Sequence, residues 1–152
     1  MPTIKHGDVL IGTSAATCVY AAELGNLVRS TAQDHAVCQM LVNTNEEVRV
    51  CMYKCLFGSE ESKATSLSAL GDSVAKFFTA IERVLERKTS SGPFFLDTLS
   101  LADLAVFDNV NSPFPGLRAL GVDLTAYPKI VACADAVAAS PAVAAFVAAG
   151  WK

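Results

Sequence analysis

The chain has 152 residues, about the size of one domain, so it has no room for a two-domain enzyme. Apolar residues make up 52% and charged residues 18%, a balance that predicts a folded protein with a buried core and excludes disorder. The net charge is -3, so we expect neither nucleic acid nor a membrane surface as a partner.

Five cysteines are scattered along the chain without a dense or even spacing: Cys18, Cys38, Cys51, Cys55 and Cys133. This pattern is typical of buried, reduced thiols in a cytoplasmic protein rather than of a disulfide framework. Cys51 and Cys55 share a helical face and, with His35, resemble half a metal site, but no CxxC pair accompanies them. We therefore predict cysteines that fill the core, and no metal.

Two apolar stretches resemble membrane or targeting segments. Residues 9–22 carry no charge and follow Lys5, as in a signal peptide, but Gly12 and several hydroxyl side chains interrupt them. Residues 136–151 are uncharged but mostly alanine and contain Pro141, so they fall short of the roughly 18 strongly apolar residues of a span. We expect no membrane segment, and a signal peptide is the alternative for the first stretch.

The first predicted elements are two short strands and a helix. Residues 3–5 and 9–11 have an extended pattern on either side of a turn, which predicts a hairpin. A helix then begins after Thr13 or Ser14, either of which can cap it by accepting a backbone N–H, and it ends near Gly25.

Two long amphipathic helices are predicted next. Apolar or small residues recur every three or four positions from about Thr31 to Gly58, which traces one helical stripe. After a polar break at 59–62, the same rhythm continues to Val84, and basic residues up to Lys88 suit the end of a helix dipole. We expect these two helices to pack as an antiparallel pair.

Local start signals predict the remaining helices. Ser100 and Asp103 form a capping box, in which the serine accepts from the third helical amide and the carboxylate reaches back. Pro128 and Pro141 stand where a first helical turn tolerates proline, so helices are expected over about 128–139 and 141–150. The chain is therefore predicted to be mainly α, with a bundle of about five or six helices.

Three motifs follow one another in the second half of the chain. They are SLAD at 100–103, YPKI at 127–130 and SPAVAAF at 140–146. In this order they resemble the helical C-terminal domain of the glutathione S-transferase superfamily, and the likeness is greatest to its sigma-like cytosolic members. Upstream, MPTI at 1–4 resembles the family's V-P-x-L strand, and TSAATCVYAA at 13–22 resembles its [EQ]-S-x-A-I-x-x-Y-L-A helix start.

The resemblance implies a fold and a domain division. Residues 1–27 correspond to a remnant of the thioredoxin-like, glutathione-binding domain, and residues 28–152 to the helical C-terminal domain. The first half of the thioredoxin-like domain has no counterpart in the sequence, so the chain looks like a truncated member. In the family, a Tyr, Ser or Cys of that half stabilises the glutathione thiolate, so the catalytic residue stays unknown here.

The resemblance also assigns three residues to glutathione binding. Ser14 and its amide would hold the γ-glutamyl carboxylate at a helix N-terminus, where free N–H groups favour an anion. Thr13 stands where the family has an acid or amide facing the glutamyl amine, and Pro2 stands at the family's cis-proline. The alternative interpretation is that Thr13 and Ser14 only cap the helix.

Other polar and aromatic candidates receive structural interpretations. Tyr20 and Tyr53 lie on helical stripes, so core or subunit contacts are predicted for them, and Cys18 is expected to be buried. Arg49 and the acidic pair Glu46–Glu47 are interpreted as a solvated face, although the family uses this helix to line its electrophile pocket.

Two functional hypotheses follow from the resemblance. The first is a glutathione S-transferase family protein that, in its complete form, conjugates glutathione to electrophilic small molecules in detoxification. It would use glutathione as co-substrate and no cofactor, act in the cytoplasm, and form a homodimer through exposed apolar faces. The alternative is a non-catalytic interaction module, similar to the transferase-like domains of translation and aminoacyl-tRNA synthetase assemblies.

Overall fold

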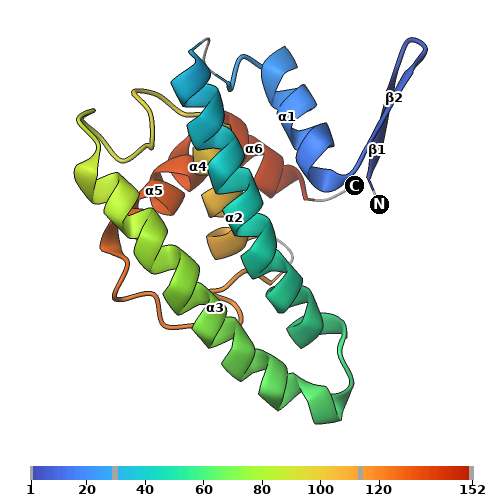
Figure 1. Ribbon diagram of the computed structural model, residues 1–152, viewed down its shortest axis with the longest axis vertical. Helices are drawn as coiled ribbons and strands as arrows, with labels where there is room; N and C mark the ends of the chain where they lie inside the picture. Colours follow the sequence, from blue (N-terminus) through green and yellow to red (C-terminus); the bar gives the residue numbers. More distant parts are fainter. Residues whose placement is uncertain (1, 29–30, 113–114, 151–152) are drawn as a thin grey trace.

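The computed structural model describes residues 2–28, 31–112 and 115–150 of the chain. Within these residues a two-stranded hairpin is followed by six helices (Figure 1). Their bounds are β1 Thr3–His6, β2 Val9–Gly12, α1 Ser14–Leu24, α2 Ala32–Phe57, α3 Glu60–Arg87, α4 Leu101–Asn111, α5 Pro128–Ala139 and α6 Pro141–Ala149. The predicted mainly α fold with a short N-terminal hairpin is confirmed.

The hairpin stands beside α1 and projects away from the helical bundle (Figure 1). Its strands are antiparallel with His6 opposite Val9, and Gly7 supplies the positive φ of 59° that the turn requires. Much of its apolar surface stays exposed, as at Leu10, which is 70% accessible. A hydrogen bond between Nδ1 of His6 and the hydroxyl of Tyr20 joins the hairpin to α1.

Helices α2 and α3 form the long antiparallel pair that the sequence predicted (Figure 1). Thr31 caps α2 by accepting a hydrogen bond from the amide of Asp34 at 3.1 Å. Their inward stripes supply much of the core, through Cys38, Leu41, Val48, Met52, Leu70, Val74, Phe78, Ile81 and Leu85.

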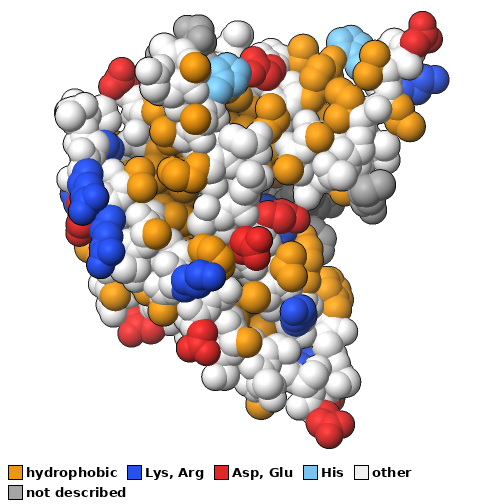
Figure 2. Space-filling view, in the orientation of Figure 1, with side chains coloured by type: hydrophobic (Ala, Val, Ile, Leu, Met, Phe, Trp, Pro, Cys, Tyr) orange, Lys and Arg blue, Asp and Glu red, His pale blue; other side chains and the backbone are white. Residues whose placement is uncertain are grey.

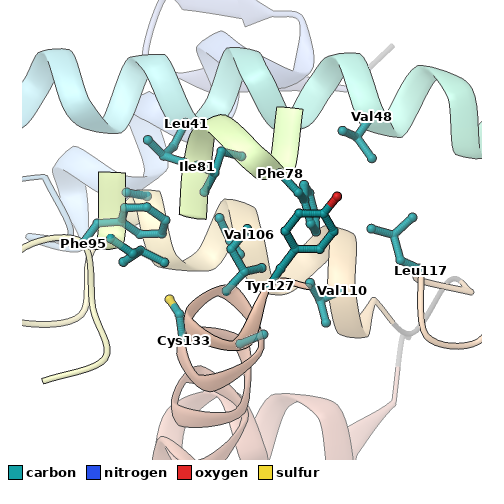
Figure 3. Close-up of a cluster of buried hydrophobic side chains, with 14 of the residues drawn as sticks. Leu41, Val48, Phe78, Ile81, Phe95, Val106, Val110, Leu117, Tyr127 and Cys133 are labelled. Atoms are coloured by element: carbon teal, nitrogen blue, oxygen red, sulfur yellow. The ribbon is translucent and has the colours of Figure 1, made fainter. Parts of the chain in front are cut away.

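The core lies where α4 and α5 pack against this pair, and Figure 3 shows side chains from all four helices gathered there. Val106, Val110 and Ile130 are completely inaccessible to solvent. The rings of Phe78 and Tyr127 meet edge to face with their centroids 5.6 Å apart. Burying each large apolar side chain contributes about 1.5–3 kcal/mol, so this cluster is the main source of stability.

The capping box at the start of α4 is present and is buried. Oδ2 of Asp103 accepts from the amide of Ser100 at 2.8 Å and from its hydroxyl at 2.6 Å. Oδ1 accepts from the amide of Phe95 at 2.8 Å and from the thiol of Cys133 at 3.4 Å. Burial raises the pKa of Asp103 above its ordinary 3.8, and these donors oppose that rise. The carboxylate thereby ties α4 to the loop before it and to α5.

A second buried carboxylate holds the start of α5. Glu82 of α3 is 6% exposed, and its two oxygens accept from the amides of Lys129 at 2.8 Å and Ile130 at 2.9 Å. Tyr127 at the N-cap makes no side-chain cap, so Glu82 satisfies amides that would otherwise lack an acceptor. Its negative charge also lies at the positive end of the helix dipole.

A pair of buried amides crosses the core between α2 and α4. Nδ2 of Asn109 donates to the backbone oxygen of Asn45 at 2.9 Å and to its Oδ1 at 2.8 Å. Nδ2 of Asn45 in turn donates to the carbonyl of Leu41 at 2.7 Å. Both asparagines are at most 1% exposed, so these bonds stand in for water at both NH2 groups and at Oδ1 of Asn45, while Oδ1 of Asn109 has no hydrogen-bond partner.

The prediction that cysteines fill the core is only partly confirmed. Cys38 and Cys133 are buried, while Cys51 and Cys55 are partly exposed. The predicted burial of Cys18 is wrong, because its side chain lies in the wall of an open cavity between α1, α2 and α4 rather than in the packed core. All five thiols are free, and no group of three or more His, Cys, Asp or Glu in the described ranges could hold a metal ion.

No single helix among the described residues is long and apolar enough to cross a membrane. Helices α5 and α6 meet the length and composition test only when they are taken together, and they bend by 74° at the break between them. Side chains of α5 such as Ile130 and Val137 are completely buried in the protein core.

Candidate functional site

The residues that the resemblance assigned to glutathione lie at the start of α1. Thr13 has φ 74° and ψ 146°, a conformation that strains a β-branched residue. The buried hydroxyl of Thr17 donates to the carbonyl oxygens of Thr13 at 2.9 Å and Ser14 at 3.0 Å. These bonds fix the first turn and hence the position of Ser14.

Ser14 does not cap the helix. Its hydroxyl donates a hydrogen bond across to Oε1 of Glu46 on α2 at 3.1 Å, and Thr13 makes no side-chain capping bond either. The interpretation of Thr13 and Ser14 as side-chain caps is therefore wrong. The physical reason is the conformation of Thr13, which differs from the extended one that ordinary capping residues adopt.

A cavity of about 390 Å³ opens between α1, α2 and α4, and Ser14 lies in its wall. A volume of this size with a mostly apolar lining and few polar groups is typical of a site for a small molecule. The apolar part of the lining consists of Ala15, Ala21, Ala22, Leu27, Val42, Leu101, Leu104 and Ala105.

Three charged side chains complete the wall of the cavity. Arg49 of α2 pairs through Nη2 with Asp108 of α4, and its Nε lies 3.5 Å from Oε2 of Glu46. Burial alone would lower the pKa of Arg49, but both carboxylates and a hydrogen bond to Tyr53 outweigh burial, so its pKa is raised and it stays charged.

The predicted solvated face at Arg49 and Glu46–Glu47 is only partly correct, because Glu47 is exposed whereas Glu46 and Arg49 are half-buried. The side chain of Arg49 is 27% exposed and that of Glu46 is 39% exposed, because partners on α1 and α4 draw them inward. Glu46 and Arg49 are three residues apart, which places them on one face of α2, and this spacing alone could have predicted their contact. Nothing local to Asp108 marks it as the partner of Arg49.

The thiol of Cys18 lines the same cavity, one turn after Ser14. Partial burial raises its pKa above the ordinary 9.0; Arg49 lowers it, while Asp108 and Glu46 raise it further. The thiol is therefore protonated at neutral pH and is a poor nucleophile, since the thiolate is the reactive form.

Pro2, the third residue assigned to glutathione, lies directly before β1 and is exposed. The bond predicted to be cis joins it to Met1, which lies outside the described residues, so this stays a prediction. Tyr53 is 43% exposed and lines a smaller cavity of about 180 Å³ that shares Arg49 and Asp108 with the first.

The family model of the glutathione S-transferase C-terminal domain matches residues 31–150, which include all of α2 to α6. No curated protein matches the chain. Neither this match nor the structural relatives below support the alternative of an interaction module in a translation assembly.

Several solved structures share the fold. A maleyl pyruvate isomerase, a bacterial glutathione S-transferase in the zeta class, is 24% identical with a TM-score of 0.73, over 95% of this chain and 71% of that chain. A maleylacetoacetate isomerase from Methylobacterium extorquens AM1, with bound malonate and glutathione (GSH), is 23% identical with a TM-score of 0.69, over the same two fractions.

A third structural relative matches over the whole length of the chain. It is Na-GST-3, a monomeric glutathione S-transferase from the hookworm Necator americanus, with 17% identity and a TM-score of 0.82, over 100% of this chain and 75% of that chain. At such identities these likenesses concern the fold, whereas the family match covers most of the sequence itself. The chain therefore belongs to the glutathione S-transferase family, whose C-terminal domain forms its helical bundle.

Proposed function

We propose that this chain binds glutathione and conjugates it to electrophilic small molecules in the cytoplasm. The observation that carries this proposal is the position of Ser14, at the start of α1 and in the wall of the apolar cavity. The five free thiols support a reducing compartment, which cell fractionation tests by the chain's recovery with cytoplasmic proteins.

The proposed chemistry divides between two parts of the site. The first amides of α1 and the Ser14 hydroxyl would hold the glutamyl carboxylate, with Thr13 and Pro2 as further contacts to the tripeptide. The apolar lining would hold the electrophile. Attack requires the glutathione thiolate, and no described residue is assigned to its activation. Residues 1–27 would thus carry the glutathione contacts and residues 28–152 most of the electrophile pocket.

Replacing Ser14 with alanine tests the glutathione contact. Losing a hydrogen bond to a charged group costs about 1.5 kcal/mol or more, so the dissociation constant for glutathione should rise about tenfold. Isothermal titration calorimetry measures it, and turnover of a chlorinated nitroaromatic reports conjugation.

Ser68→Ala is the matched control, because Ser68 is exposed on α3, and it should bind as the original chain does. Equal binding by Ser14→Ala and the original chain would contradict the assignment of Ser14. A chain that releases no heat with glutathione would contradict the proposed function itself.

We also propose that the chain forms a homodimer through an apolar stripe on α2. Val50, Tyr53 and Phe57 recur at helical spacing and are exposed, Phe57 by 75%. Figure 2 shows hydrophobic side chains exposed on this face of the molecule among charged ones. Light scattering after size exclusion should give twice the mass of one chain, and Phe57→Ser should lower it. A mass of one chain for the original protein would contradict the dimer.

A further inference from the structure

The Ser14 hydroxyl already has a carboxylate partner within the chain. It donates to Oε1 of Glu46 at 3.1 Å, a contact that joins α1 to α2 across 32 residues of sequence. A glutathione carboxylate would need this same donor under the function proposed above. The two carboxylates cannot both occupy the position in front of one hydroxyl, because they would repel each other at short range.

Arg49 compensates the Glu46 charge only in part. Its Nη2 pairs with Asp108, and its Nε forms a longer ion pair with Oε2 of Glu46 at 3.5 Å but has no hydrogen-bond partner. The charged wall of the cavity therefore holds two carboxylates and one guanidinium, with the Glu46 charge the less compensated of the two. An anion that enters beside Ser14 meets a net negative wall.

The geometry points to Glu46 as a specificity-determining residue that competes with ligand carboxylates for the Ser14 hydroxyl and so weakens glutathione binding. This inference rests on the proposed function, since it concerns the same site.

Calorimetric titration with glutathione tests the inference on Glu46→Gln and Glu46→Ala. Both variants remove the negative charge, and glutamine keeps the size of the side chain and adds an amide donor. The affinity for glutathione should rise about tenfold in each, equivalent to about 1.4 kcal/mol. The double variant Ser14→Ala with Glu46→Gln should lose this gain, because Ser14 is the donor that the substitution releases.

Glu47→Gln is the matched control, since it removes the same charge from an exposed neighbouring position of α2. It should change the affinity less than twofold. If the original chain and Glu46→Gln bind glutathione equally, the inference is overturned and the proposed function stands. If only the Glu46 variants bind, the inference holds and the proposed function fails for the chain as it exists. If none of them binds, both are overturned.

Discussion

Replacing Asp103 with alanine is expected to lower the free energy of unfolding by about 3–5 kcal/mol. The substitution removes the acceptor of the Phe95 amide and of both the amide and the hydroxyl of Ser100, and all of these groups are buried. Each buried donor left without an acceptor costs about 1–3 kcal/mol. Since a domain of this size is stable by only about 5–15 kcal/mol, the variant should unfold at much lower urea concentration.

Asp97→Ala is the matched control for this experiment, because Asp97 is exposed in the loop before the same helix. It should shift the free energy of unfolding by less than about 0.5 kcal/mol. Asp103→Asn keeps the shape and one acceptor, so it should fold with an intermediate stability even if the alanine variant does not fold. Equal urea midpoints for Asp103→Ala and Asp97→Ala would contradict the role given to the box.

The raised pKa of Asp103 also fixes the sign of a pH effect. Because burial raises its folded pKa above 3.8, the folded protein holds this proton more tightly than the unfolded chain does. Its contribution to stability is then complete below about pH 3.8 and declines as the pH rises through the folded pKa. The stability of the original chain relative to Asp103→Asn should therefore decrease as the pH rises above about 4, and an increase would contradict the direction of the shift.

The second large effect is expected at Glu82. Glu82→Ala should lower the free energy of unfolding by about 2–4 kcal/mol, because the amides of Lys129 and Ile130 lose their acceptors and α5 loses the charge at its N-terminus. Urea titration followed by circular dichroism measures this loss.

Glu82→Gln separates geometry from charge at the same position. Only one of its two terminal atoms can accept, so one of the two amides of α5 would face an NH2 group. We expect it to lose more than half as much stability as Glu82→Ala. Glu86→Ala, at an exposed position of α3, should lose less than about 0.5 kcal/mol. If Glu82→Ala were as stable as this control, α5 would not depend on the buried carboxylate.

Most of the fold was predictable because its signals are local. Thr31 begins α2 through a bond to an amide three residues away, and the box at Ser100 begins α4 within the same distance. The prolines at 128 and 141 mark helix starts through their own backbone geometry. The apolar stripes of α2 and α3 indicate their buried faces only in part: Leu41 and Val74 are buried, whereas Leu67 is exposed.

The candidate site was much less predictable, because its contacts join distant parts of the chain. Glu46 meets Ser14 across 32 residues, and Glu82 meets the start of α5 across 47. No rule of local spacing connects such positions. The strained conformation of Thr13 was equally unpredictable, since no residue next to it in the sequence indicates a positive φ at this β-branched position. The resemblance located Ser14, but only the tertiary structure revealed which carboxylate it faces.

The asparagine pair in the core has a bearing on the charged wall of the cavity. Arg49 follows Asn45 by one helical turn, and Asp108 immediately precedes Asn109. If α2 slid along α4 by one turn, Asn109 would lose its bonds to Asn45 inside a dry interior, and such a loss is costly. The Asn45–Asn109 pair therefore fixes the register of α2 against α4 and keeps Arg49 opposite Asp108. Contacts in the interior of the bundle thus determine how charges align at its surface.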